Sequence, residues 1–324
     1  LQTIGLRTGV AVRLSAEALD LPPAGPLTPV RGRFAAVPLE EAITVIARKL
    51  GLQVIRAEAY VELHPLPAVI RAGEPLTADE LELLDLLQST TLDLPNGRPT
   101  FDQLVAAIDL RLAEIDQQRV TAGRTALGLS LENRGRDLVS GEQIVALPAR
   151  PTLYLALELL HEQTQLTWYP WDAGVVIVPK RDLHQRLLLK RINLNVQNLD
   201  AGALLDELSR RSGVRFRYDA GALAGVRPDR RMISFAGSRT SVRSVLDVIQ
   251  RQTGLTWSVD EDGVLIGYRD RIGMLLDLGN GISVPIPESQ IPDELRAIID
   301  QRIQRWLEDQ RTPSVPATRP ASRN

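Results

Sequence analysis

The stretches Gln165–Asp182 (QLTWYPWDAGVVIVPKRD) and Gly254–Asp270 (GLTWSVDEDGVLIGYRD) carry nearly the same sequence. Each begins close to Leu-Thr-Trp, passes through a short acidic turn that ends in Gly, and continues into an aliphatic run and a basic-acidic close. An acidic-Gly turn between two apolar runs is a signal for a β-hairpin. The sequence therefore predicts the same hairpin twice, each time as part of a larger repeated unit.

An amphipathic helix is predicted before each hairpin. Apolar residues recur there at the i, i+3, i+4, i+7 spacing of a helix that buries one face. The same spacing occurs five times in the chain, at Leu39/Ala42/Ile43/Ile46, Phe101/Leu104/Val105/Ile108, Leu153/Ala156/Leu157/Leu160, Ala201/Leu204/Leu205/Leu208 and Val242/Val245/Leu246/Ile249.

The residues that flank these stripes are typical of helix ends. Four stripes follow a residue type that favours the N-cap, and the fifth follows Pro38, which the first turn tolerates. Three stripes are followed by a Gly suited to the left-handed conformation that ends a helix, whereas the helix from Phe101 is expected to continue to Val120. The N-cap residues are Thr100, Thr152, Asp200 and Ser241, and the glycines are Gly51, Gly213 and Gly254.

Short segments with β propensity precede the helices, and extended apolar segments follow them. The pattern predicts an α+β protein made of tandem small modules, each built from paired β-α-β units with mixed sheets, and a helix near the C-terminus. The segments predicted as strands before the helices are GRFAAV (32–37), TTLDL (90–94), EQIVAL (142–147), RINLNV (191–196) and RMISFAG (231–237).

The repeats divide the chain into regions. Residues 1–71 are expected to be an incomplete module, because the match begins in the middle of a pair and the first half of that pair would precede Leu1. Two fuller modules are expected at 91–181 and 190–270. The other regions are a helical connector (72–90), a strand-turn and amphipathic helix (271–310), and a Pro/Ser-rich tail expected to be disordered (311–324).

Composition narrows the classes of function. The 324-residue chain has no Cys, which excludes disulfides and thiol chemistry. Its net charge of −2 gives no electrostatic basis for binding nucleic acid or an anionic membrane. It has no run approaching the ~20 apolar residues that span a bilayer.

The region Ile192–Gly267 resembles the secretin and TonB short N-terminal domain and related N-terminal modules of secretins. The residues that carry the resemblance are INLNVQNLDAGALLDELSRRSGVRFRYDAGAL and MISFAGSRTSVRSVLDVIQRQTGLTWSVDEDGVLIG. The pattern recurs more loosely at 92–178 and in truncated form at 5–63. The resemblance implies small α/β interaction modules of the bacterial envelope, usually periplasmic, although the chain shows no secretin pore region.

No set of residues predicts catalysis, cofactor binding or a metal site, so we assign no catalytic, cofactor-binding or metal-ligating residue. His161 lacks the second His of a zinc-binding HExxH helix, and we expect it to be structural and partly exposed. His64 and His184 are expected in loops or at the surface. Trp168 and Trp257 are expected in cores or between modules, and Trp171 is expected to be exposed.

The favoured function is a non-enzymatic array that binds protein partners, or associates with itself, through sheet edges. It would have no cofactor and would act in the periplasm or envelope of a Gram-negative-type bacterium. One alternative is an enzyme or small-ligand receptor with a site between modules, for which residues 72–90 and 114–142 leave room. Another is a KH-like nucleic-acid binder, which would need a GXXG loop with basic neighbours.

Overall fold

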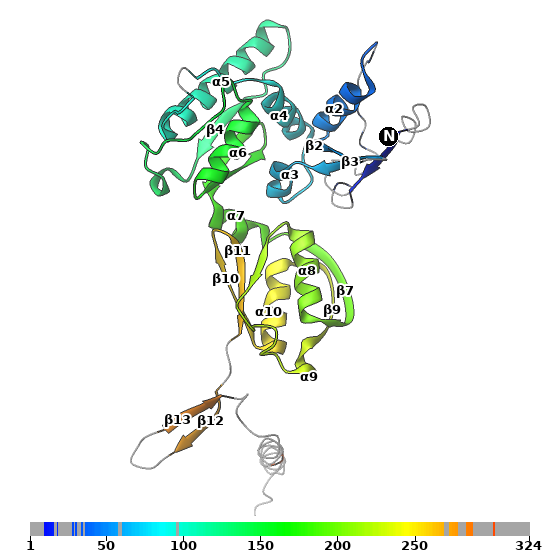
Figure 1. The fold of residues 1–324 in the computed structure, drawn as a ribbon, viewed down its shortest axis with the longest axis vertical. Helices are drawn as coiled ribbons and strands as arrows, with labels where there is room; N and C mark the ends of the chain where they lie inside the picture. Colours follow the sequence, from blue (N-terminus) through cyan, green and yellow to red (C-terminus); the bar gives the residue numbers. More distant parts are fainter. Residues whose placement is uncertain are drawn as a thin grey trace, which may run out of the picture.

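The computed structural model describes residues 36–57, 60–94 and 97–268, together with residues 10–15, the backbone of 272–277 and 283–287, and the single residues 18, 28, 30, 34 and 301. The described chain is of the α+β class, with small separate sheets covered by helices (Figure 1). This confirms the predicted fold class. Among the described residues, no helix is both long enough and apolar enough to cross a bilayer.

One unit, a strand followed by a helix and a hairpin, occurs three times. In each copy the first strand pairs in parallel with the second strand of the hairpin. That second hairpin strand is therefore central in the sheet, and the first hairpin strand lies at an edge. The first module has β1 (Ala11–Leu14), α2 (Leu39–Lys49), β2 (Leu52–Arg56) and β3 (Tyr60–Pro65). The second has β4 (Ser130–Asn133), α6 (Leu153–Gln163), β5 (Leu166–Trp171) and β6 (Gly174–Pro179). The third has β8 (Phe216–Tyr218), α10 (Val242–Thr253), β10 (Leu255–Asp260) and β11 (Gly263–Tyr268).

The third module contains a second strand-helix unit that completes the predicted pair. Strand β7 (Arg191–Asp200) leads into α8 (Ala201–Ser212), and β9 (Met232–Ser241) leads into α10. The two strands form an antiparallel ribbon, which bulges where its register shifts. The predicted strands RINLNV and RMISFAG are thereby confirmed.

The second module keeps this arrangement in reduced form. Its long helix α5 (Phe101–Thr121) corresponds to α8, but the segments before α5 and α6 meet only at the bridges Thr91–Thr152 and Thr100–Ile144. The predicted strands TTLDL and EQIVAL are therefore wrong as regular strands. Prolines lie close by: Pro99 follows TTLDL and Pro151 follows EQIVAL, and neither can donate a ladder hydrogen bond.

Helix ends and buried faces follow the sequence. The four predicted N-cap side chains each accept a hydrogen bond from the backbone of the first turn. Gly213 and Gly254 end their helices with φ of 76° and 81°. The predicted stripes of α6, α8 and α10 are wholly buried, whereas in α2 only Ile43 of the predicted four is buried.

The described residues pack into three hydrophobic cores. The first is small and lies under β2 and β3. The second extends from Leu66 to Ile177 and includes α3 (Pro67–Ala72) and α4 (Ala78–Ser89), so these two helices pack on the second module. The third core is that of the third module.

The β5–β6 hairpin joins the second and third cores. Trp168, Val175 and Ile177 face the second core, whereas Tyr169, Val176 and Val178 face the third. A strand buried on both faces reads as a continuous apolar run, and this accounts for the uninterrupted VVIV of β6.

The remaining elements are short. They are the 3₁₀ helix Arg136–Leu138, α7 (Lys180–Leu187), α9 (Pro228–Arg231) and the antiparallel pair β12 (Ile272–Asp277) and β13 (Ser283–Pro287). These two strands lie in the segment predicted as a strand-turn, and the turn itself, at 278–282, lies outside the described residues. The helix predicted around Leu295 and Trp306, and the tail predicted from 311 to 324, lie outside the described residues.

Candidate functional site: the module junction and the β10 edge

Helix α7 connects the second and third modules, and Figure 1 shows it between the upper part of the molecule and the lower one. Its Leu183 and Leu187 are buried in the third core. Its Arg186 donates a hydrogen bond of 3.0 Å to the carbonyl of Ala72, the last residue of α3. The Arg186 guanidinium also lies 4.1 Å from the ring centroid of Tyr169 in β5. One short helix thus holds together α3, the second module and the third module.

Two glycines allow the helices to approach closely at this junction. A Cβ on Gly73, just after α3, would stand 2.7 Å from Leu187 Cδ2, and one on Gly213, at the end of α8, would overlap Ile70 Cγ2. Both glycines also have positive φ, near 77°, which other residues adopt only with strain. The approach of α3 to α7 and α8 therefore depends on Gly at these positions.

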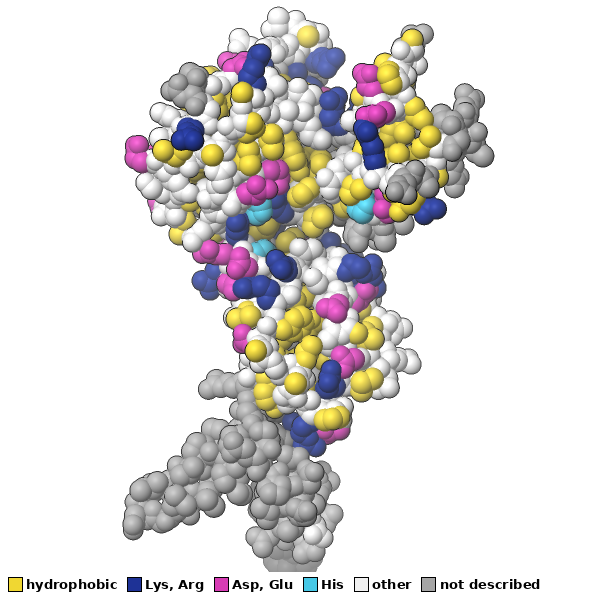
Figure 2. All heavy atoms as spheres, viewed as in Figure 1, with side chains coloured by type: hydrophobic (Ala, Val, Ile, Leu, Met, Phe, Trp, Pro, Cys, Tyr) yellow, Lys and Arg dark blue, Asp and Glu magenta, His cyan; other side chains and the backbone are white. Residues whose placement is uncertain are grey.

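A cleft of about 350 Å³ lies at this junction, within the size range of small-molecule sites. Residues from α3, α6, β5, α7 and the β10–β11 turn line it. In the space-filling view, His and charged side chains gather where the upper and lower parts of the molecule meet (Figure 2). The polar lining residues are Arg71, His161, Thr167, Lys180, His184, Glu261 and Asp262.

The charged side chains of the cleft are mostly ion-paired, or are groups whose charged form is disfavoured by burial. Arg71 forms an ion pair with Glu158 and lies 5.2 Å from the ring centroid of Trp168. Burial, reinforced by the positive charge of Arg71, lowers the pKa of His161 to about 4, so this imidazole is neutral near pH 7. Burial also lowers the pKa of Lys180, against the opposing effect of Asp262 and Glu261.

One hydroxyl in the cleft has no hydrogen-bond partner within the part of the chain that the structure describes. Thr167 is fully buried on the face of β5 that carries Tyr169, and its Oγ1 makes no hydrogen bond to the described residues. A buried polar atom without a partner costs free energy. The cleft therefore offers hydrogen-bonding groups, namely this hydroxyl and the neutral imidazole of His161, with little net charge.

Two of the three histidines lie in other elements of the fold than the sequence predicted. His161 is half-buried on α6, as expected. His64 and His184 are partly exposed but do not lie in loops, because His64 lies within β3 and His184 lies on α7, where its Nδ1 is 3.0 Å from the carbonyl oxygen of Asp260. His161 and His184 line the same cleft, which sequence spacing did not reveal.

The tryptophans follow the prediction. Trp168 is fully buried, Trp257 is half-buried against the third core, and Trp171 is 47% exposed. Trp171 lies 5.1 Å from the Arg186 guanidinium, so it stands at the rim of the junction.

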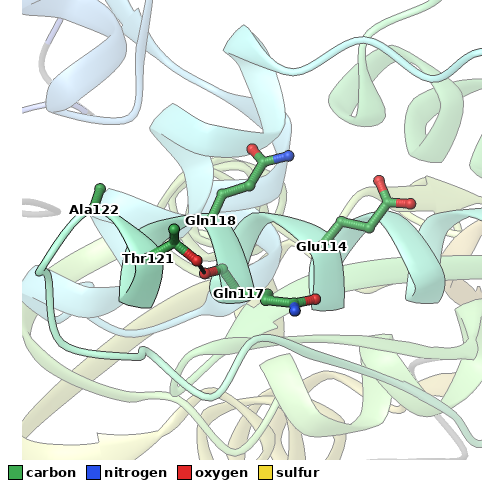
Figure 3. Close-up of a pocket in the computed structure, with 5 residues that line it drawn as sticks. All are labelled: Glu114, Gln117, Gln118, Thr121 and Ala122. Carbon is green, nitrogen blue, oxygen red and sulfur yellow. Dashed lines mark hydrogen bonds between the residues drawn. The ribbon is translucent and has the colours of Figure 1, made fainter.

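A second hollow lies along α5 and is lined by that helix alone. Glu114, Gln117, Gln118, Thr121 and Ala122 surround it, and their side chains extend from successive turns without converging on one point (Figure 3). The hydrogen bond drawn there joins the Thr121 hydroxyl to the Gln117 carbonyl, at 2.9 Å. Within the described part of the chain, no three His, Asp or Glu residues are placed to hold a metal ion.

The outer edge of β10 has backbone groups without a backbone partner among the described residues. Val264 N donates to Arg215 O, and Asp219 N donates to Ile266 O, so Val264 and Ile266 direct their backbone groups toward β8. Their neighbours in β11 therefore face β10 and pair with Thr256, Ser258 and Asp260. The N–H and C=O groups of Trp257 and Val259 consequently point away from the sheet.

The corresponding edge in the second module is closed. Strand β5 places Trp168 and Pro170 at the positions of Trp257 and Val259, and both are fully or nearly fully buried. Pro170 has no N–H, and α3 and α4 pack against β5. Helix α7 packs against β10 and makes its hydrogen bond at the strand's end, to Asp260, and Figure 1 shows β10 at the outer margin of the third module.

Comparison of the chain with protein-family models, with curated proteins and with solved structures finds no match.

Proposed function

We propose that the chain is a non-enzymatic array of protein-interaction modules that acts in the periplasm or envelope of a Gram-negative-type bacterium, as part of a secretion, transport or signalling assembly. The observation that carries this proposal is the open backbone edge of β10 at Trp257 and Val259. Unpaired edge groups are the surface to which a further strand adds. The resemblance of Ile192–Gly267 to secretin and TonB short N-terminal modules supports the compartment.

The charge distribution agrees with this role. Net charge is small, and many exposed Arg residues are paired with neighbouring acids, as Arg210 is with Glu207 and Arg134 with Glu132. Paired surface charges contribute little attraction for a polyanion. Protein partners that contribute backbone hydrogen bonds fit such a surface better than nucleic acid does.

Photo-crosslinking in living cells tests the proposal. A photoreactive amino acid replaces Val259 in the full chain, and a matched control places it at Gln118, an exposed residue of α5. We expect protein adducts from position 259, recovered in the envelope fraction, and few from position 118. A chain that fractionates with the cytosol and forms no adduct at position 259 would contradict the proposal.

A second candidate is a small-ligand receptor whose site is the junction cleft. The observation that favours it is Thr167, whose buried hydroxyl has no partner among the described residues and lines a cleft of about 350 Å³. A panel of uncharged and zwitterionic metabolites, screened by thermal shift, tests this candidate. A ligand that stabilises the chain but not its Thr167→Val variant would support it, and a panel without any shift would count against it.

A further inference from the structure

We propose that the β10 edge binds a second copy of this chain, in an antiparallel strand pair centred on Ser258. The inference rests on the proposed interaction function and names the partner for one of its surfaces. Its starting point is that Trp257 and Val259 present two N–H and two C=O groups outward from the same short strand.

The geometry of an antiparallel pair fixes the register. If two copies of β10 meet about a two-fold axis through Ser258, then Trp257 of each copy stands opposite Val259 of the other. Residues that exchange both backbone bonds must face each other in this way. All four outward groups of each copy are then paired, and the two three-stranded sheets become one continuous sheet. A two-fold contact of this kind is self-complementary and closes on itself.

The side chains of β10 suit this register. Ser258 is exposed and uncharged, so its counterpart across the axis meets no like charge. Thr256 stands opposite Asp260, where a hydroxyl can donate to a carboxylate. Trp257 and Val259 are both half-buried on the core face, and an aromatic residue opposite a β-branched one is a favourable cross-strand pair. No two acidic residues of β10 face each other.

The equivalent strand of the second module, β5, differs from β10 at its edge. In β5 the residue equivalent to Val259 is Pro170, which is buried and lacks the N–H. Its sheet is therefore closed to strand addition, although the hairpin is otherwise the same. The β7–β9 ribbon is interrupted by register shifts and by Asn198 and Arg239, whose φ is positive. Such irregularities discourage edge pairing.

Charge substitution at Ser258 tests the register. We expect the full chain to sediment with an average mass that rises from 35.7 kDa toward twice that value as concentration increases. S258K and S258E should each raise the dissociation constant about tenfold or more, because like charges directly opposite each other repel. Mixing the two variants in equal amounts should restore the dimer. Mixtures that stay as monomeric as either variant alone would overturn the register.

Replacing Val259 with proline, the residue at the equivalent position of β5, tests the edge itself. V259P removes the outward N–H, and the position tolerates Pro in the otherwise similar β5. We expect this variant to remain monomeric with an unchanged circular dichroism spectrum, whereas V259T, which keeps the N–H, should dimerise. If V259P unfolds, the S258K and S258E mixture decides the question.

The outcomes separate this inference from the proposed function. A wild-type chain that remains monomeric from about 1 µM to about 1 mM, the range of weak and transient interfaces, would overturn self-association. If crosslinks from position 259 then identify a different protein, the interaction function stands and the second copy is excluded. A dimer that V259P leaves intact would also overturn the inference, because that dimer would use another surface.

Discussion

At the scale of single residues, one buried hydroxyl recurs where a helix turns into the next strand. Thr253 Oγ1 donates to Ile249 O at 2.6 Å and accepts from Leu255 N at 3.0 Å. Thr164 makes the same two bonds after α6, and Ser212 makes them after α8. In each case the side chain accepts a hydrogen bond from a backbone amide just past the helix end and adds a second donor to a carbonyl of the last turn.

We predict that Thr253→Val destabilises the chain by about 1–3 kcal/mol, because it leaves the buried amide of Leu255 unsatisfied. The control is Thr121→Val, which removes an exposed hydroxyl that makes a similar bond to Gln117 O and should change stability by less than about 0.5 kcal/mol. Urea unfolding measures both changes. Equal effects of the two substitutions would contradict the assigned role.

His161 predicts a pH dependence. Its pKa is about 4 in the folded chain, whereas an exposed His has a pKa of about 6.5. Between these values the unfolded chain binds a proton that the folded chain excludes. The stability that comes from the neutral imidazole is therefore fully present above about pH 6.5 and is lost as pH falls through about 4.

We predict that His161→Gln flattens the slope of unfolding free energy against pH in this interval, by an amount approaching one proton. Urea titrations at several pH values measure the slope. His64→Gln is the control, since His64 lies on β3 away from the junction cleft. An unchanged slope in His161→Gln would show that the imidazole titrates normally in the folded chain.

At the scale of elements, the sequence predicted what depends on local pattern. Helix stripes, N-caps and the acidic-Gly hairpins were read correctly because periodicity and end residues determine them. The reduced ribbon of the second module was not predicted, since strand propensity in TTLDL and EQIVAL competes with neighbouring prolines. The junction was beyond sequence analysis because Gly73, Gly213 and Arg186 acquire their roles only through long-range packing.

Gly213 offers the sharpest test of element packing. Gly213→Ala places a methyl group at positive φ and against Ile70, whereas Gly221→Ala does so at a similar φ with no atom within 4 Å. We expect Gly221→Ala to cost about 1 kcal/mol from backbone strain and Gly213→Ala to cost clearly more. Urea unfolding of the two variants measures the difference. Equal losses of unfolding free energy would mean that the end of α8 is not in close contact with α3.

At the scale of the whole molecule, α7 couples the modules through Arg186. We predict that Arg186→Ala costs about 1–2 kcal/mol, from the lost bond to Ala72 O and the lost stacking on Tyr169. It should also speed hydrogen exchange at the amide of Gly73, which follows α3. Arg181→Ala, an exposed position on the same helix, is the control. Equal exchange rates at the Gly73 amide in both variants would show that α7 does not stabilise α3.

Whether a repeated sheet edge is open or closed is decided by the neighbours of each module. The two strands share Leu-Thr-Trp, yet α3 and α4 pack against β5, whereas α7 packs against β10 and the outward groups of Trp257 and Val259 have no backbone partner among the described residues. Sequence comparison identified the repeat but not which strand forms each edge. Pro170 is a difference visible in the sequence, whereas the elements that pack beside each edge follow only from long-range contacts.

The most direct measurement of the central claim is residue-resolved amide hydrogen exchange along β10 in the full chain. At low concentration, we predict slow exchange at Ser258, whose amide faces β11, and fast exchange at Trp257 and Val259, with protection of these two amides appearing as the partner binds. Slow exchange at Trp257 and Val259 in the dilute chain would show that the edge is already covered, and would contradict the account.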